Sequence, residues 1–231
     1  MKSKKGGVNM SKLLWDQTGE RYFETGVDHG VLYVQQDGKY PKGVAWNGLN
    51  QVDENPSGGE PNDIYADNMK YLTMRSAEDF GVTIQCYTYP DEFGECDGQA
   101  QLAPGVTIGQ QARKNFGIAY RTRVGNDVDG DALGYKLHLV YNCSVSPSER
   151  SYQTINDSPD AISFSYEAST IPIPIEGYRP SSFIVLDSRS APPDKLKALE
   201  DILYGTEGED PENQARLPLP DEIIKLMEVG G

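Results

Sequence analysis

The residues best suited to acid–base chemistry are the adjacent Asp28 and His29, because a carboxylate beside an imidazole can orient the ring and tune its proton affinity. Neighbouring side chains on an extended chain point apart, so we expect this pair to mark a turn without a shared catalytic target. The second histidine, His138, falls on the polar side of an alternating segment, which favours a hydrogen bond over metal ligation. Neither histidine predicts catalysis.

A second candidate for chemistry is an acidic run whose members, Asp127, Asp129 and Asp131, have the one, three, five spacing of a calcium loop. Gly130 then falls at position four, although the loop requires glycine at position six. His138 falls at position twelve, where a calcium loop has a glutamate that binds the ion through both carboxylate oxygens. The run therefore predicts an aspartate-rich turn.

Sequence motifs for other chemistries are missing. The chain has no nucleotide-binding loop, nucleophile elbow, zinc-protease helix signature or paired cysteine ligands. We therefore expect a protein that is not an enzyme and that uses no cofactor or metal. One enzyme class stays open as an alternative: a hydrolase with two carboxylates could be concealed among 35 acidic residues, since no spacing rule exposes it.

Cysteine usage and the N-terminus indicate where the protein is made. Cys86, Cys96 and Cys143 are odd in number and have no short paired spacing, so we expect free thiols from a reducing cytoplasm. No apolar run approaches the ~18 residues that span a bilayer. The lysines after Met1 precede Gly-Gly-Val-Asn and no apolar core. We expect neither membrane insertion nor export by such a signal.

The charge is strongly acidic and unevenly distributed. Acidic residues outnumber basic ones by 35 to 21, which gives a net charge of −14. Residues 1–12 carry four lysines and no acid, and residues 191–231 carry ten acids and four bases. A surface with this balance repels phosphates, so we expect no sequence-independent grip on nucleic acid.

The positioning elements are predicted to be mainly β-strands joined by many turns, because 24 glycines, 15 prolines and 14 tyrosines favour strands and turns. Apolar and polar residues alternate in several short segments. Each such strand would have one apolar face for a core and one face for solvent or a partner. The expected strands are Val31–Gln35, Val44–Asn47, Val82–Tyr87, Phe116–Val124, Tyr135–Cys143, Ile162–Glu167 and Ser182–Leu186.

Two polar connections and a helical C-terminus complete the expected organisation. Gly125–Asp131 would join two long hairpin strands, and Asn50–Asp67, with five acids and no base, would be a long loop. A helix is expected from Pro192 to Tyr204, then an acidic linker over Gly205–Glu212 and a short amphipathic stretch over Asp221–Val229. We divide the chain into a flexible basic arm (1–12), a β domain (13–190, with loop 50–67) and a C-terminal helical segment (191–231).

Seven stretches in this order resemble the major tail tube proteins of phages with long non-contractile tails that infect Gram-positive hosts. The resemblance runs from about Lys12 to Ser190 and is weaker in the last forty residues. The stretches are Leu14–Gly30, Ala45–Leu49 (AWNGL), Tyr65–Ala77 (YADNMKYLTMRSA), Phe80–Gly98, Asn115–Asn126 (NFGIAYRTRVGN), Tyr135–Asn142 (YKLHLVYN) and Tyr152–Phe164 (YQTINDSPDAISF).

The resemblance implies a β-sandwich or barrel-like fold with a flanking helix, in hexameric rings that stack around a closed intersubunit β-barrel. It also implies residence in the virion tail, passage of double-stranded DNA, and tape-measure, terminator and distal tail proteins as partners. A wall rich in bases would retain phosphates, so we expect a lumen with net negative charge.

Candidate contact residues follow from this picture. Arg121, Arg123, Asp127, Asp129 and Asp131 are candidates for intersubunit contacts, and an ordinary salt-bridged surface is an equal alternative for the arginines. A surface β-sandwich that binds carbohydrate or a receptor stays open as another function. The candidate lumen or ring-junction acids are Asp53, Glu54, Glu60, Asp63, Asp67, Glu78 and Asp79.

Overall fold

The fold is mainly β, as expected. The computed structural model describes residues 13–155, 160–208, 210 and 213–228, so the basic arm at 1–12 and parts of the linker 205–212 lie outside it. The strands are β1 (Phe23–Val34), β2 (Gly43–Ala45), β3 (Leu49–Glu54), β4 (Ser57–Gly58), β5 (Pro61–Ala66), β6 (Met69–Arg75), β7 (Glu78–Asp79), β8 (Gly81–Cys86), β9 (Ala100–Ala103), β10 (Val106–Ile108), β11 (Phe116–Asn126), β12 (Gly130–Val145), β13 (Phe164–Thr170) and β14 (Phe183–Asp187). The helices are α1 (Phe93–Cys96), α2 (Pro193–Tyr204) and α3 (Pro220–Met227).

One antiparallel sheet forms the body, with the order β2-β1-β11-β12-β13-β8-β3. Two strands pair with successive parts of one edge of β12: β14 pairs with Lys136–Val140, and β13 pairs with Cys143–Val145. Among the described strands no ladder joins β2 to β3, so the sheet curls without closing into a barrel within the chain.

The curl of the sheet creates the first core. Leu32 of β1, Ile118 of β11 and Val140 of β12 pack in one cluster with Ile84 of β8 and Tyr166 of β13. Helix α1 closes one end of this cluster, where the Phe93 ring lies 4.7 Å from Trp46 and 4.8 Å from Tyr166 between centroids. Strands from both halves of the sheet thus share one interior.

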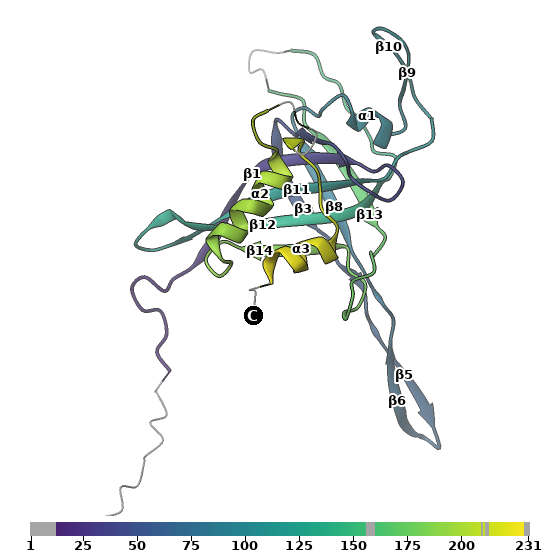
Figure 1. Cartoon of the computed structure of the whole chain (residues 1–231). Coiled ribbons are helices and arrows are strands. Elements are labelled where there is room, and N and C mark those ends of the chain that lie inside the picture. Colours follow the sequence, from purple (N-terminus) through teal and green to yellow (C-terminus); the bar gives the residue numbers. More distant parts are fainter. Residues whose placement is uncertain (1–12, 156–159, 209, 211–212, 229–231) are drawn as a thin grey trace, which may run out of the picture.

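Helices α2 and α3 lie over the opposite face of β1, β11 and β12 and create a second core (Figure 1). Leu199 and Leu203 of α2 pack in the same cluster as Leu137 and Leu139 of β12. The Tyr33 hydroxyl donates to the carbonyl of Leu203 at 2.7 Å. The expectation of a free second face is therefore wrong for β11 and β12, because the C-terminal segment buries it.

Most expected elements are confirmed, with shifted ends. Strand β8 alternates as predicted, with Val82, Ile84 and Cys86 buried. Helices α2 and α3 match the two C-terminal predictions, and none of the described helices is both long and apolar enough to cross a bilayer. Strand β1 begins at Phe23 and not at Val31, because two register shifts interrupt the two-residue period before Val31. Strand β13 begins at Phe164 and not at Ile162.

The predicted loop over 50–67 is mostly strand, which corrects the expectation. Strand β3 pairs with β8, β4 pairs with β7, and β5 pairs with β6 in a hairpin that projects from the body (Figure 1). At the tip, Asp67 and Asn68 have φ values of 50° and 63°, as a tight two-residue hairpin turn requires. We call β5 and β6 with this turn, residues 61–75, the arm.

The second core generates a prediction about stability. Leu199 is fully buried between α2 and the sheet, so Leu199→Ala should lower the free energy of unfolding by about 2–5 kcal/mol through lost contacts and a cavity. Lys197→Ala on the exposed face of α2 removes only an i,i+4 pair with Asp201, and should cost less than about 0.5 kcal/mol. Urea denaturation measures both, and equal losses would contradict the helix packing.

Candidate assembly surfaces

The arm exposes apolar side chains although it has no interior of its own. Every residue of β5 and β6 is exposed. Tyr65 and Tyr71 are 68% and 70% exposed, and Ile64 lies opposite Leu72 across the hairpin. An isolated two-stranded hairpin is at best marginally stable in water, so these side chains favour burial against another surface.

Polar contacts along the arm hold its register. Asp63 accepts a hydrogen bond from Thr73 at 2.6 Å and pairs with Lys70 at 2.8 Å. These contacts lower the pKa of the Asp63 carboxyl, first through the hydrogen bond from Lys70. The apolar residues of the arm were not predicted as contact residues. The Asp67-Asn68 dipeptide favours a tight hairpin turn and could have indicated the hairpin over 61–75.

Strand edges differ in their protection. The outer side of β2 is covered by the C-terminal segment, because Gly43 N donates to Ala215 O and Leu217 N donates to Tyr40 O. Among the described strands, β3 and β14 each pair along one edge only. On β14, Phe183 and Val185 are also exposed. Unpaired edges with apolar side chains are templates for pairing with another chain.

A third apolar surface lies where the described chain begins. Leu13, Leu14 and Trp15 are all more than 60% exposed. The segment is fastened a few residues later, where Gly19 N donates to Asp127 Oδ1 at 2.9 Å and Asn126 Nδ2 donates to Gly19 O at 3.0 Å. The segment is thus attached to the β11–β12 turn through Gly19, and the three apolar side chains that precede it stay exposed.

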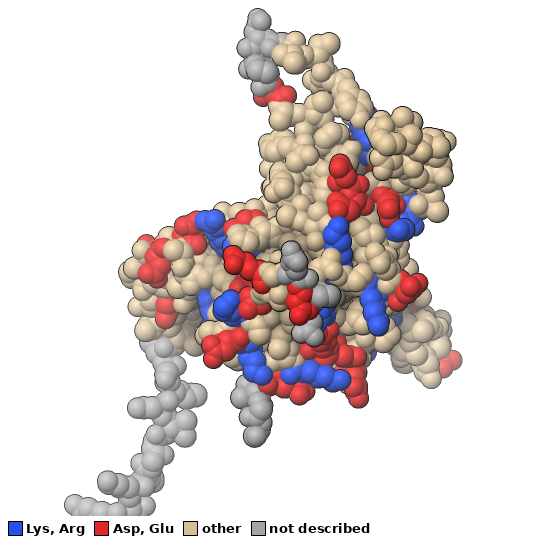
Figure 2. Space-filling view, turned by 45° about the horizontal axis from the view of Figure 1, so that its top comes forward, with Lys and Arg blue, Asp and Glu red and all other residues tan. Residues whose placement is uncertain are grey.

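The seven candidate acids do not form one group. Asp53 is held by amide donors, from Gln51 at 2.7 Å and from Gln85 at 3.4 Å. Asp63 is paired within the arm, and Glu54 binds Tyr120 and His138. The remaining candidates are exposed at the arm tip or near its base: Glu60, Asp67, Glu78 and Asp79. On the face shown in Figure 2, acidic and basic side chains are intermixed over the body.

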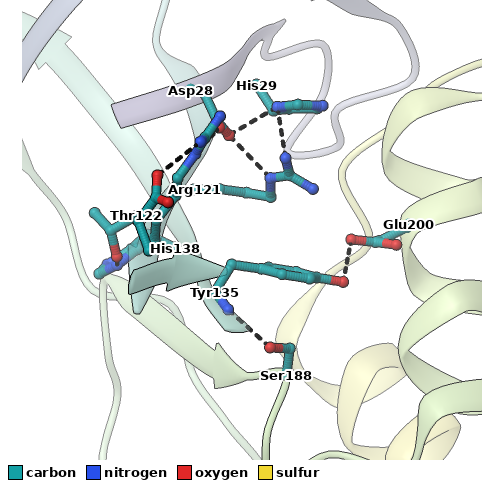
Figure 3. A network of polar contacts seen from close by, with 10 residues as sticks. Asp28, His29, Arg121, Thr122, Tyr135, His138, Ser188 and Glu200 are labelled. Carbon is teal, nitrogen blue, oxygen red and sulfur yellow. Dashed lines mark hydrogen bonds and ion pairs between the residues drawn. The ribbon is translucent and has the colours of Figure 1, made fainter. Parts of the chain in front are cut away.

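Asp28 is the centre of an ion-pair cluster between β1 and β11 (Figure 3). Arg121 Nε lies 3.0 Å from Asp28 Oδ1, and Arg123 Nε lies 3.2 Å from Asp28 Oδ2. The Arg121 guanidinium also lies over the Tyr135 ring, whose hydroxyl donates to Glu200 of α2 at 2.7 Å. The cluster ties helix α2 to the sheet, so both arginines have carboxylate partners within their own chain.

Asp28 and His29 are in contact, which corrects the expectation that they point apart. His29 has a φ of 52°, so the chain is not extended there and the Nδ1 atom comes to 2.7 Å from Asp28 Oδ1. The same nitrogen lies 2.9 Å from Arg121 Nη2. Because one ring nitrogen either donates or accepts, only one of these contacts is a hydrogen bond in a given tautomer.

The three aspartates of the calcium-like spacing bind separate partners. Asp127 accepts from Gly19, Asp129 accepts from the Asn126 side chain, and Asp131 pairs with Arg123 at 3.0 Å. No group of metal-ligating side chains occurs in the part of the chain that the structure describes. The aspartate-rich turn is confirmed, and Asp127 anchors the N-terminal segment.

His138 lies in a polar group on the inner face of the sheet, where it makes the expected hydrogen bonds. Its Nδ1 lies 3.1 Å from Glu54 Oε1 and its Nε2 lies 3.0 Å from Thr122 Oγ1. The imidazole stacks on the Tyr120 ring with an interplanar angle of 6°. Only 12% of the His138 side chain is exposed.

The expected thiols are free and buried. Burial raises the pKa of Cys86 to about 11 and that of Cys96 to about 12, so neither is a ready nucleophile. The largest hollow among those described has a volume of about 920 Å³ and lies between α1 and β9–β10. Two of its carboxylates are already paired, Glu92 with Lys42 and Glu95 with Lys114.

Comparison with known proteins adds no relative. No protein-family model matches the chain, and no curated protein shows a significant similarity to it.

The Asp28 cluster generates a prediction about pH. Burial raises the pKa of the Asp28 carboxyl, but the hydrogen bonds from Arg121 and His29 outweigh it, so its net pKa is lowered. The resulting stability is present above the ordinary pKa and is lost as pH falls through the lowered value. Asp28→Asn should therefore cost about 2 kcal/mol of unfolding free energy at pH 7, and the difference should shrink in acid.

Asp131→Asn provides the control, because Asp131 is 54% exposed and pairs with Arg123 at the surface. We expect a loss below about 1 kcal/mol and little change with pH. Urea denaturation from pH 7 down to about pH 3 compares the two variants. A constant difference between wild type and Asp28→Asn over that range would refute the linkage.

Proposed function

We propose that this chain is the major tail tube subunit of a long-tailed, non-contractile phage. Copies would form hexameric rings that stack into a hollow tube, with a closed β-barrel between subunits and an acidic lumen for double-stranded DNA. The protein would be made in the bacterial cytoplasm and reside in the virion tail. Tape-measure, terminator and distal tail proteins are partners by resemblance.

The observation that carries the proposal is the arm. It projects from the body, has no buried residue, and exposes tyrosine, isoleucine, leucine and methionine side chains (Figure 1). A chain in isolation gains little from ordering such a hairpin, whereas a neighbouring copy could bury it. Reaching into a neighbour is what a stacked subunit requires.

Open edges support the same proposal. Among the described strands, β3 pairs along one edge only and β14 pairs only with β12, although Ser181 Oγ bonds the backbone N and O of Phe183 on the outer side of β14; β2 is covered by the chain itself. A sheet that protects one end and leaves other edges open is suited to pairing with copies of itself. Completion of these edges by neighbours would give the intersubunit barrel, since the sheet does not close within one chain.

The alternative of a two-carboxylate hydrolase gains no support from the carboxyl groups. An acid catalyst of that class needs a carboxyl with a raised pKa. Among the described carboxyl groups, five have a pKa that departs from the ordinary value, and in each of them the pKa is lowered: Glu24, Asp28, Glu54, Asp63 and Asp187. The carbohydrate or receptor alternative is likewise left without a specific observation in its favour.

Assembly tests the proposal directly. Purified protein viewed by negative-stain electron microscopy over a range of concentrations should show rings or tubes. Tyr65→Ser combined with Tyr71→Ser should abolish them and change the unfolding free energy by less than about 0.5 kcal/mol, because both side chains are exposed in one chain. Sedimentation would show the variant as a folded monomer.

Tyr178→Ser is the matched control, since this tyrosine is 75% exposed and lies outside the arm. It should assemble like the wild type. A wild-type protein that stays monomeric at high concentration would refute the tail tube proposal. Normal tubes from the double variant would refute only the role of the arm.

The acidic lumen gives a separate expectation. Assembled tubes should not retain duplex DNA even at about 50 mM salt, because a protein that makes few phosphate contacts gains little from counterion release. A filter-binding or gel-shift assay with labelled duplex measures retention. Salt-sensitive binding at that ionic strength would show that cations line the duct.

A further inference from the structure

Glu54, His138 and Thr122 form a polar link between parts of the sheet that share no backbone ladder. Glu54 ends β3, which pairs only with β8 among the described strands, while Thr122 and His138 lie on β11 and β12. His138 bridges the other two, at 3.1 Å from Glu54 Oε1 and 3.0 Å from Thr122 Oγ1. The link lies at the root of the arm, since β3 leads through β4 into β5.

One arrangement of donors and acceptors makes all of these contacts hydrogen bonds. Thr122 has one hydroxyl hydrogen, which it donates to Glu24 Oε1 at 2.9 Å, so its oxygen must accept from His138 Nε2. Glu54 Oε1 already accepts from the Tyr120 hydroxyl at 2.7 Å, and an ionised carboxylate only accepts. The contact with Nδ1 therefore needs a second ring hydrogen. Only the imidazolium satisfies all these bonds together.

The carboxylates are held in the ionised state that this count assumes. The hydrogen bond from His138 is the largest cause that lowers the pKa of Glu54. Burial raises the pKa of Glu24, but hydrogen bonds from Lys136 and Thr122 outweigh it and lower it overall. Both groups are therefore acceptors at neutral pH.

Charged side chains near His138 come from β1, β3, β12 and β14. Glu54 on β3 and Glu24 on β1 face it directly or through Thr122, and Lys136 on β12 is paired with Glu24 at 2.8 Å. On β14, the residue opposite His138 is the apolar Val185, and Asp187 lies opposite Lys136. The His138 side chain is 12% exposed, so water has little access to the ring nitrogens, whereas the Glu54 side chain is 36% exposed.

We propose that His138 is a protonation-dependent latch for the root of the arm. The imidazolium fastens Glu54 of β3 to Thr122 of β11, and loss of one ring proton releases one of the two bonds. Strand β3, which has an open edge, then detaches more often from β8 and loosens the arm that follows it. The latch is a property of the single chain and does not depend on tail assembly.

Two measurements on this chain, at a concentration low enough to keep it monomeric, test the latch. At low pH, the ring nitrogen chemical shifts of His138 should show two protonated nitrogens. When one ring proton is lost at higher pH, hydrogen exchange in the β3–β8 ladder should rise about tenfold after correction for the intrinsic effect of pH. His138→Gln, which carries no titrating ring, should exchange faster at low pH and show no such rise. Amides of the β11–β12 ladder should keep their protection and so report an intact fold.

Asp53→Asn is the matched control. It removes a carboxylate from the neighbouring position of β3, where the partners are Gln51 and Gln85 and not the latch, so the pH dependence should persist. A singly protonated His138 ring at low pH would overturn the proposal. So would pH-independent exchange in β3, or a pH-dependent rise that survives in His138→Gln.

Discussion

Strands β11 and β12 have apolar side chains on both faces, and the rest of the architecture depends on covering both of them. One face is buried when the sheet curls and brings β8 and β13 over it. The other is buried by α2 and α3, which follow the last strand of the sheet. Burial of apolar area is the main favourable term in folding, so neither cover is dispensable. The C-terminal helices are thus part of the body.

The polar groups follow from the same constraint. Where the curled sheet and the helices meet, the Asp28–Arg121 pair joins β1 to β11, and Tyr135 of β12, which lies under Arg121, donates a hydrogen bond to Glu200 of α2 (Figure 3). Inside the curl, where the apolar core ends, Glu54 and His138 meet across strands that share no ladder. Polar groups that are largely withdrawn from water, such as Asp28 and His138, need their partners, so each cluster favours a particular arrangement of the elements around it.

Outside the two covered faces, the single chain leaves apolar side chains exposed. The arm, the open edges of β3 and β14 and the segment around Trp15 all expose apolar atoms or backbone groups that one chain does not satisfy. The arm and the N-terminal end of the described chain leave the body at separate places (Figure 1), so a single partner patch would not cover both. The proposed rings and tube would arrange copies of the chain around and along an axis, where separate surfaces can each meet a neighbour.

Elements whose signals are local could be predicted from the residues alone. The two-residue alternation of Val82, Ile84 and Cys86 specified a strand and its buried face, and the apolar stripe from Leu196 to Leu203 specified a helix. Only the tertiary structure decided that 50–67 is mostly paired strand, that Asp28 meets His29, and that Glu54 meets His138 84 positions away. Local periodicity indicates which side of a strand is apolar, but packing between distant segments decides which element covers that side. The positive φ of His29 interrupts the two-residue period, so the side chains of Asp28 and His29 come together although regular alternation would separate them.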